Sequence, residues 1–541
     1  MRKFFIAVPV LALCAQLSAQ NINQSVQVTN DYVTRFADFQ KQGDGLRVPD
    51  SLYRFDYSFD YSVFDTPYKG AYEFSPYRIQ VTPEPRPYDG GTLWLRAGAG
   101  YSLHPSFELA WAALRRGNAR VDVFADAGGY VGKYRRMRTS DPFAGHDIHG
   151  RAGVGGEYLL PSVRLTWQAG YEGIAAREDV ETPYFSSGFN SGTAGVRAQS
   201  RPGRGSMLFY DVNLRYRYAA ENYAAALSRG GLGENNVRVG VSVGPELEGK
   251  YRILLDAAFE MDALRERAAT SGKSRLFPAS HAALRPHVDF SLGPVQLDAG
   301  VRLDYGEWSA DKKFTVAPDV TARLDLLEQD LTVFAGVSGG QSMQGFYQTK
   351  HVNHFAFRTE PGASLSREKI RVRAGLDGHW NSRLQYGFEA GYVSHAGLPL
   401  SSYCAVYLVD FSSVYARARA AWNDERVSVD GTLGYDYLMM PEFPGAYAPP
   451  AFTADLRGSY NWQRRIFAGA FLEAASVRKA LWPDEEGVGG YVNLGLTGEF
   501  RIDRRWGVWA EAGNLLGMRI ERLPGYIEQG PYLTLGLSLK L

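Results

Sequence analysis

Apolar and polar residues alternate along most of the chain, with a period of two residues. Between residues 295 and 305 the apolar positions are Val295, Leu297, Ala299, Val301, Leu303 and Tyr305, and the positions between them are polar, charged or glycine. Successive side chains of a β-strand point to opposite faces of a sheet, so this pattern predicts a strand with one apolar and one polar face. The same alternation recurs over residues 208–218, 427–437, 452–462 and 533–541.

A soluble β-sandwich also alternates, so three further features decide between the two all-β classes. Many of the predicted strands hold about 10–13 residues, which suits a tilted membrane-spanning strand better than a globular sheet. The ends of the apolar faces carry aromatic residues of the kind that form an interfacial girdle, namely Tyr216, Tyr218, Tyr305, Tyr437 and Trp462. The connections between strands alternate between short and long.

The connection lengths give a strand count and an orientation. Short joins occur at residues 115–118, 293–294 and 423–426, whereas residues 219–235, 263–281 and 438–450 form long joins. Barrels of the outer membrane have short periplasmic turns and longer external loops. The pattern predicts a closed, transmembrane, antiparallel β-barrel of about 22 strands over residues 92–541. Residues 404–409 either extend one of these strands or lie in a loop.

Residues 1–19 have the features of a secretory signal peptide. Arg2 and Lys3 precede an apolar run at residues 4–13, and Ala19 ends a small-residue cleavage site. Lipidation of Cys14 is not expected, because Leu13 before it is bulky where a lipidation site has a small residue. Cleavage leaves one cysteine, and the apolar run is too short for a membrane-spanning helix. These features predict export to the bacterial outer membrane without an intrachain disulfide.

Charge and composition exclude two classes of protein. The chain has 59 Lys and Arg residues against 58 Asp and Glu residues, a net charge of +1. A broad nucleic-acid footprint needs a basic excess, so no nucleic-acid partner is expected. With 33 Tyr, 29 Phe and 10 Trp the chain is also too aromatic to be disordered. The expected partners are therefore outer-membrane lipids.

Residues 20–91 are predicted to form an extended periplasmic or luminal segment. Its most unusual part is an aromatic strip with one face formed by Tyr53, Phe55, Tyr57, Phe59 and Tyr61. One interpretation is a loosely packed linker. The other is that the strip enters the lumen, or docks onto a periplasmic or lipoprotein partner by adding to its sheet edge.

The predicted inward face carries charges of both signs. The candidate lumen-wall residues are Arg215, Arg217, Arg302, Arg371, Arg373, Asp298 and Asp304. Placed across neighbouring strands, such residues form a self-neutralising, hydrated wall. A selectivity filter would need one sign concentrated in a ring or ladder, and the pairs Arg215/Arg217 and Arg371/Arg373 are the best indication of that alternative.

Signals for catalysis or metal binding are weak. Residues 240–244 and 336–340 match Gly-x-Ser-x-Gly, but both fall in predicted strands, whereas a nucleophile elbow needs a strand-turn-helix context. His351 and His354 share a predicted outer loop, and a metal site needs more ligands than a pair. We therefore expect no enzyme activity, no catalytic residue, no metal site and no cofactor.

The two ends of the mature chain resemble a known class of protein. Residues 509–516 (Trp-Ala-Glu-Ala-Gly-Asn-Leu-Leu), the Leu-Pro-Gly-Tyr run at 523–526 and the closing strand at 532–541 look like the end of TonB-dependent receptor barrels. Residues 65–76 resemble the lead-in of plugless, receptor-like outer-membrane barrels of the Bacteroidota. No plug domain or TonB box is recognisable. The resemblance implies a receptor-like barrel that works as a solute channel or transport protein; the alternatives are a membrane-embedded scaffold subunit of an envelope complex and a component of a TonB-dependent transporter.

Overall fold

The computed structural model describes residues 92–541 apart from short gaps. The gaps are 102, 137–141, 178–185, 202–207, 222–228, 248–250, 269–273, 309–310, 327–329, 357–363, 382, 403–404, 443–444, 483–485 and 529. The predicted signal peptide (1–19), the segment 20–91 with its aromatic strip, and Cys404 lie outside the described residues.

The described residues are predominantly strand. The first strands are β1 (Leu93–Tyr101), β2 (Ser106–Arg116), β3 (Ala119–Arg136), β4 (Pro142–Leu159), β5 (Val163–Arg177), β6 (Ser186–Ser200), β7 (Leu208–Glu221), β8 (Arg229–Leu247), β9 (Tyr251–Ala268), β10 (Ser274–Leu292), β11 (Val295–Trp308) and β12 (Asp311–Leu326). They are followed by β13 (Leu331–Gln344), the helix α3 (Phe346–Val352), β14 (Ser364–Trp380), β15 (Leu384–Ser401), β16 (Val406–Asn423), β17 (Val427–Met439), β18 (Phe452–Trp462), β19 (Ile466–Ala475), β20 (Tyr491–Arg501), β21 (Trp506–Gly513), β22 (Tyr526–Ile527) and β23 (Tyr532–Lys540).

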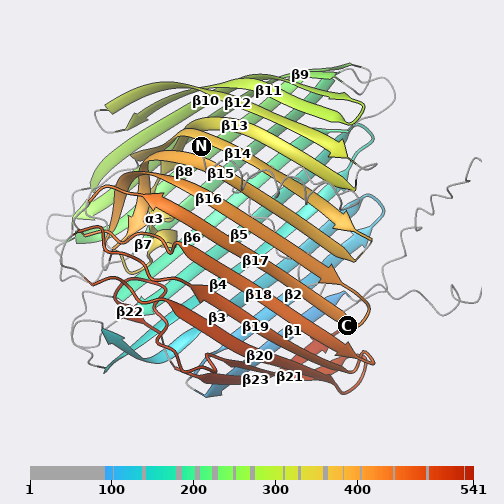
Figure 1. Ribbon diagram of the computed structural model, residues 1–541, viewed down its shortest axis with the longest axis vertical. Helices are drawn as coiled ribbons and strands as arrows, with labels where there is room; N and C mark the ends of the chain where they lie inside the picture. Colours follow the sequence, from blue (N-terminus) through green and yellow to red (C-terminus); the bar gives the residue numbers. More distant parts are fainter. Residues whose placement is uncertain are drawn as a thin grey trace, which may run out of the picture.

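The strands close into one antiparallel barrel (Figure 1). Each strand pairs with the next along the chain, and β1 closes the ring on β23 through eight paired positions. The two-residue β22 is not part of the wall order, because β21 pairs directly with β23. The remaining 22 strands form the wall, which confirms the predicted class and strand number.

Every predicted strand is present, but many extend further at one end than the alternation indicated. Strand β8 begins at Arg229 instead of residue 236, and β15 ends at Ser401 instead of residue 394. The extension of β8 includes Gly233 and Asn235, which interrupt the apolar face, whereas Glu234 between them points inward. Backbone hydrogen bonds between strands need no apolar side chain, so the ladder continues where the alternation has already stopped.

The outward face is apolar, as the alternation predicted. On β7 the exposed side chains include Leu208, Val212, Leu214, Tyr216 and Tyr218, and on β23 they include Leu533, Leu535 and Leu537. Exposed apolar bands of this extent on a closed barrel are typical of a lipid-facing surface. The barrel is accordingly an outer-membrane structure.

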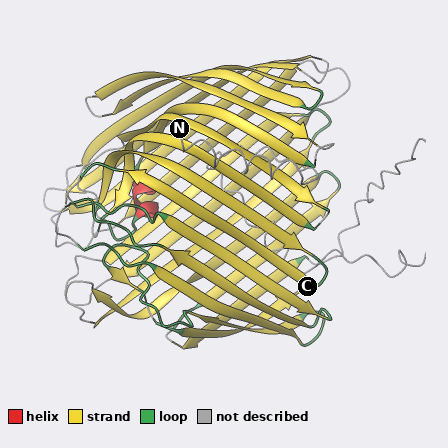
Figure 2. Cartoon of the chain, viewed as in Figure 1, coloured by secondary structure: helices red, strands yellow, loops and turns green. Residues whose placement is uncertain are grey.

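The two ends of the barrel differ. At one end most connections hold only two to four residues, and the two-residue connection between β10 and β11 has Gly293 at a positive φ of 58°. Both ends of the described chain meet there, since the backbone N–H groups of Thr92 and Leu93 donate to the carbonyl of Leu541. The helix and the long loops lie at the opposite end (Figure 2). Following the usual asymmetry, we assign the short-turn end to the periplasm and call the other the outer end.

Helical segments in the described part of the chain fall short of the length and apolar character that a membrane-spanning helix requires. The helix α3 has seven residues, and it contributes to the interior of the barrel, as described below.

Candidate functional site

Ion pairs line the inward face, some within one strand and others between neighbouring strands. Arg302 donates to Oδ1 of Asp304 at 3.1 Å and to the carbonyl of Gln341 at 2.9 Å. The same Asp304 oxygen lies 2.9 Å from Nε2 of His281, and the Asp304 side chain is fully buried. The structure thus brings together Arg302 and Asp304, two of the candidate wall residues, within one buried polar network.

The other candidates lie apart from this network. Arg371 pairs with Glu368 at 2.6 Å, and Arg373 lies 3.7 Å from Glu389. Asp298 accepts a hydrogen bond from Arg285 at 2.8 Å. Arg217 pairs with Glu234 at 3.1 Å. Arg215 lies opposite Arg238 in the strand register. Carboxylates therefore accompany Arg371, Arg373 and Arg217, an arrangement that fits a mixed-charge wall.

The helix α3 starts a loop that folds into the barrel. Gly345 precedes the helix, and its backbone N–H donates to Oε1 of Gln348 at 3.0 Å. A Cβ at Gly345 would lie 2.7 Å from a carboxylate oxygen of Glu234, so glycine permits the close approach of this loop to β8. At the other end the N–H of Asn353 donates to the carbonyl of Thr349. We call residues 345–356 the helix loop.

Lys350 fixes the helix loop to β7. Its side chain is fully buried, and Nζ donates to Oε1 of Glu221 at 2.7 Å and to the carbonyls of His354 and Ala356 at 3.2 and 2.8 Å. Burial lowers the pKa of Lys350 below its ordinary value, while the Glu221 carboxylate acts in the opposite direction. The three acceptors match the three protons of an ammonium group, so the Lys350 side chain is satisfied without water.

A second set of contacts ties the helix loop to β5, β7 and β8. The hydroxyl of Tyr347 and Nε2 of His351 contact the two carboxylate oxygens of Glu172 at 2.9 and 3.0 Å. The guanidinium of Arg217 lies 4.0 Å above the Tyr347 ring. Glu234 accepts from both Arg217 and the backbone N–H of Tyr347. The helix loop leaves the wall at β13, so these contacts carry it across to strands five or more positions away.

The loop is also held on the side of the wall near its origin. Nδ2 of Asn353 donates to the carbonyl of Ser402 at 2.8 Å and to the hydroxyl of Ser401 at 3.2 Å, at the outer end of β15. The fully buried Asn353 thus joins the loop to the strands that follow it in sequence. Together with the contacts to β5, β7 and β8, this bond makes the helix loop a bridge inside the outer mouth.

Beneath the loop the inward face changes from polar to apolar. The buried cluster there consists of Ile174, Ala176, Phe189, Ala219, Leu232, Leu264, Phe346, Phe355 and Tyr526. Six of these side chains come from the outer ends of β5 to β9 and two from the helix loop. Burial of apolar side chains is the main favourable term for such packing, so the cluster holds the loop against the wall.

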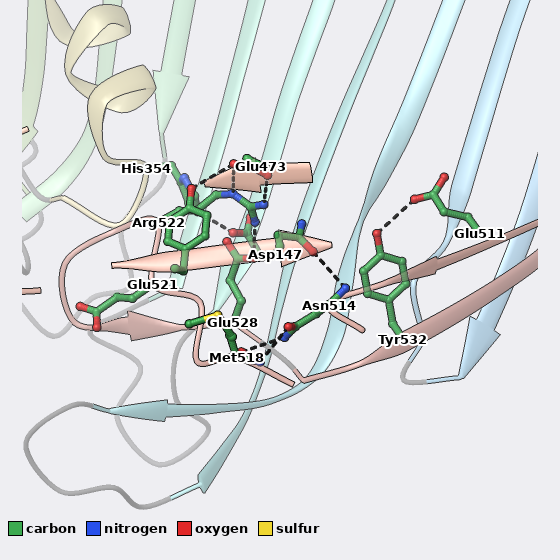
Figure 3. Close-up of polar contacts among 12 residues, drawn as sticks. Asp147, His354, Glu473, Glu511, Asn514, Met518, Glu521, Arg522, Glu528 and Tyr532 are labelled. Carbon is green, nitrogen blue, oxygen red and sulfur yellow. Dashed lines mark hydrogen bonds and ion pairs between the residues drawn. The ribbon is translucent and has the colours of Figure 1, made fainter. Parts of the chain in front are cut away.

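A second loop folds over the same end from the strands that close the barrel. Arg522 pairs with Glu473 at 2.6 Å and also contacts Glu528, and the guanidinium of Arg478 donates to the backbone carbonyls of residues 521 and 522. Figure 3 shows the contact of Arg522 with Glu473 and, beside it, the contact of His354 with Asp147. We call residues 514–528 the return loop.

The two loops meet. Strand β22, in the return loop, pairs with Arg135 and Arg136 of β3, and so passes β23, β1 and β2. The ring of Tyr526 stacks on that of Phe355, with centroids 4.0 Å apart and an interplanar angle of 11°. The helix loop and the return loop are therefore one connected structure within the outer mouth, and we refer to them together as the lid.

The alternation pattern does not predict the lid. Residues 339–368 lack a regular alternation of apolar and polar positions, and this interval is the only trace of the helix loop in the sequence pattern. His351 and His354 do share a loop at the outer end, as expected, but they do not face the same group: His351 contacts Glu172, whereas His354 lies 2.8 Å from Asp147 on β4. The Leu-Pro-Gly-Tyr run at 523–526 belongs to the return loop, where Gly525 has a positive φ of 86°.

Both Gly-x-Ser-x-Gly matches lie wholly inside strands, at residues 240–244 of β8 and 336–340 of β13. Ser242 is paired with Asp256 across β8 and β9 in the regular ladder. Neither match has the sharp strand-to-helix turn of a nucleophile elbow, so they carry no catalytic argument.

Comparison with known proteins identifies the architecture. No protein-family model and no curated protein sequence matches the chain. Solved structures do match, among them the FrpB iron transporter from Neisseria meningitidis, with a TM-score of 0.63 at 9% identity over 84% of this chain and 82% of that one. The copper transporter OprC gives 0.61 at 13% identity, over 84% and 81% of the two chains. A mutant of the ferric enterobactin receptor PfeA from Pseudomonas aeruginosa gives 0.59 at 12% identity, over 83% and 80%.

The fold is that of the TonB-dependent receptor barrels.

In this receptor-type barrel the lid concentrates polar and titratable groups at the outer end. Lys350, His351 and His354 each contact a wall carboxylate, on β7, β5 and β4 respectively. Burial lowers the pKa of His351, but the hydrogen bond to Glu172, the charge of that carboxylate and the hydrogen bond to the Tyr347 carbonyl together raise the pKa above its ordinary value of 6.5. The helix loop is thus held to the wall by side chains of three different strands.

Proposed function

We propose that this receptor-type barrel carries small polar solutes across the outer membrane, and that the lid controls entry at the outer mouth. The observation that carries the proposal is that the helix loop crosses from β13 to β5, β7 and β8 and is held there by side-chain contacts. A loop that served only as a connection would not need to cross the interior. Movement of a lid that covers a binding space is a common way to control access.

The wall and the architecture support a transport role. The described part of the inward face carries many charged side chains, among them Arg285, Arg302, Arg371 and Asp319, which would keep a passage hydrated. The matched structures of this fold include a copper transporter and an iron transporter. We extend the transport role to this chain on the basis of that structural similarity. The mixed sign of the wall favours polar solutes without a strong selection by charge.

The proposal also gives residues 20–91 a role. The aromatic strip formed by Tyr53, Phe55, Tyr57, Phe59 and Tyr61 either occludes the lumen from the periplasmic side or docks onto a periplasmic or lipoprotein partner. It lies close in sequence to the first strand, which gives it a high effective concentration at the lumen mouth.

The lid is tested by conductance of the purified full chain in planar bilayers. Replacing residues 346–356 with a Gly-Ser linker should raise the open conductance, because it removes Lys350, His351 and His354 together. The matched control replaces the periplasmic turn at residues 424–426 in the same way and should leave conductance unchanged. Equal conductance of all three proteins would contradict a gating role for the lid.

The segment 20–91 is tested separately by deletion of residues 20–78. Higher conductance, or greater sensitivity of cells to large antibiotics, is expected if the strip occludes the lumen. Unchanged permeability together with loss of a co-purifying envelope protein would identify the strip as a docking peptide. That result would favour the alternative in which the barrel is a scaffold subunit.

A further inference from the structure

Three side chains with metal-binding atoms converge where the lid meets β4. Asp147 and His149 are two positions apart on β4, so both project into the barrel. His354 comes from the end of the helix loop. Nε2 of His354 lies 2.8 Å from Oδ2 of Asp147, and Nε2 of His149 lies 2.8 Å from Oδ1 of the same carboxylate. One ligand atom from each of the three residues lies within 4.8 Å of the others.

The donor set suits a first-row transition metal. Two imidazoles and one carboxylate are typical ligands of Zn²⁺ and related divalent ions. Metal–ligand bonds of about 2.0–2.2 Å place two donors on one tetrahedral ion about 3.4 Å apart. The two imidazole nitrogens lie 2.8 Å from the Asp147 oxygens and the three donors lie within 4.8 Å of one another, so small side-chain rotations that separate the donors would make room for an ion.

Access and local charge also favour a cation. The His149 side chain is 50% exposed, whereas that of His354 is 11% exposed. An ion can therefore approach from the His149 side and keep a water ligand there. Two further carboxylates, Glu172 and Glu528, lie close enough to interact electrostatically with His149 and Asp147. Glu528 is already paired with Arg522 and Glu172 with His351, so the group that attracts the ion is the Asp147 carboxylate itself.

We propose that Asp147, His149 and His354 bind one divalent first-row transition metal ion at the junction of the lid and the wall. Two ligands belong to β4 and the third to the helix loop, so the bound ion joins the lid to the barrel and stabilises the closed lid. The binding stands on the geometry of the three residues alone. Its effect on gating rests on the proposed function.

The site is tested by calorimetric titration of ZnCl₂ into the full chain in detergent. The protein carries no histidine tag and is stripped with a chelator beforehand. One Zn²⁺ per chain is expected, with affinity reduced at least tenfold in His149→Gln and in His354→Gln. The matched control is His379→Gln, which alters a histidine at the short-turn end of β14, away from the lid, and it should bind Zn²⁺ like the unaltered chain.

Two further readouts make the result decisive. Heat-dependent migration on gels shows that each variant retains a folded barrel, and the visible spectrum of bound Co²⁺ reports imidazole and carboxylate coordination. Absence of saturable binding, or binding unchanged in both His149→Gln and His354→Gln, overturns the site.

The gating consequence is measured in the same bilayers. Zn²⁺ should lower the conductance of the unaltered chain and have no effect on His149→Gln. If Zn²⁺ binds but the conductance does not change, the bound ion does not stabilise the closed lid, although the metal site itself is established. Failure of the metal site is therefore distinguishable from failure of the transport function, because binding and conductance are measured separately.

Discussion

Two arcs of the inward wall carry the same kinds of residue in very different surroundings. Where the lid contacts β5 to β8, the charged pairs are desolvated: Lys350 and Glu221 are about 1% exposed or less, and Glu234, the partner of Arg217, is fully buried. On the arc from β14 to β18 the Arg419–Asp377 pair, 2.6 Å apart, is 52% and 29% exposed.

The difference comes from the lid and not from the strands. Both arcs obey the same alternation, and in both the charged side chains point inward. A buried pair carries a large desolvation penalty that its partner must offset, whereas an exposed pair is screened by water. Residue type and strand register therefore determine which face a charged side chain points to. Its contribution to the free energy of unfolding depends on whether the lid shields it from water.

The largest expected effect follows from breaking one pair in each arc. Lys350→Met leaves the Glu221 carboxylate buried without its partner, and we expect a loss of about 3–5 kcal/mol in the free energy of unfolding. Arg419→Met in the exposed arc should cost about 0–1 kcal/mol. Urea titration of barrels folded into lipid vesicles measures both. The double variant Lys350→Met/Glu221→Leu should recover much of the loss, and similar costs for the two single variants would remove the distinction between the arcs.

The next effect compares the two faces of one region. Val301→Arg puts a charge on the exposed apolar face of β11, and we expect destabilisation by about 2–4 kcal/mol if the position is near the bilayer midplane. Thr321→Arg introduces the same side chain on the inward face of β12, opposite Asp298 in the register, and should cost much less. Equal costs in the same vesicle assay would contradict the assignment of the outward face to lipid.

A smaller effect concerns the contact that joins the two loops of the lid. Phe355→Leu and Tyr526→Leu each keep an apolar side chain but remove the stacked ring pair. A double-mutant cycle on hydrogen exchange of residues 345–356 should give a coupling energy of about 0.5–1.5 kcal/mol. A coupling near zero would mean that the two loops open independently.

The smallest expected effect is a pH dependence of the lid. Because the pKa of His351 is raised by Glu172, its contribution is fully present below the ordinary histidine pKa of 6.5 and is lost as the pH rises through the raised value. Conductance should therefore increase with pH above 6.5. His351→Gln should abolish this component, and an identical profile for the variant would show that another group is responsible.

The sequence predicted the wall well because its signal is local. The alternation of Val301 with Arg302 and Asp304 arises because one face of each strand contacts lipid and the other contacts water. The alternation does not predict the outer extensions, because residues such as Gly233 and Asn235 interrupt the apolar face of β8 while the backbone ladder continues.

The lid could not be predicted in the same way. Its defining contacts join residues far apart in sequence, such as Lys350 with Glu221 and His354 with Asp147, at separations of 129 and 207 residues. A seven-residue helix has no amphipathic period long enough to detect. The individual histidines were noted in the sequence, but their wall partners emerge only once the strands are closed into a ring.

The seam between β1 and β23 constrains how the molecule is made. The hydroxyl of Thr92 and the carbonyl of Leu541 are 449 residues apart in sequence and adjacent in space. Contacts between residues so far apart in sequence form slowly, because closing a very long loop costs conformational entropy before the contact is made. Until the last strand has been synthesised and exported, β1 and β21 both present open hydrogen-bonding edges that invite aggregation. The ring can therefore close only after β23 is available to pair with both β1 and β21, and until then these two edges need protection.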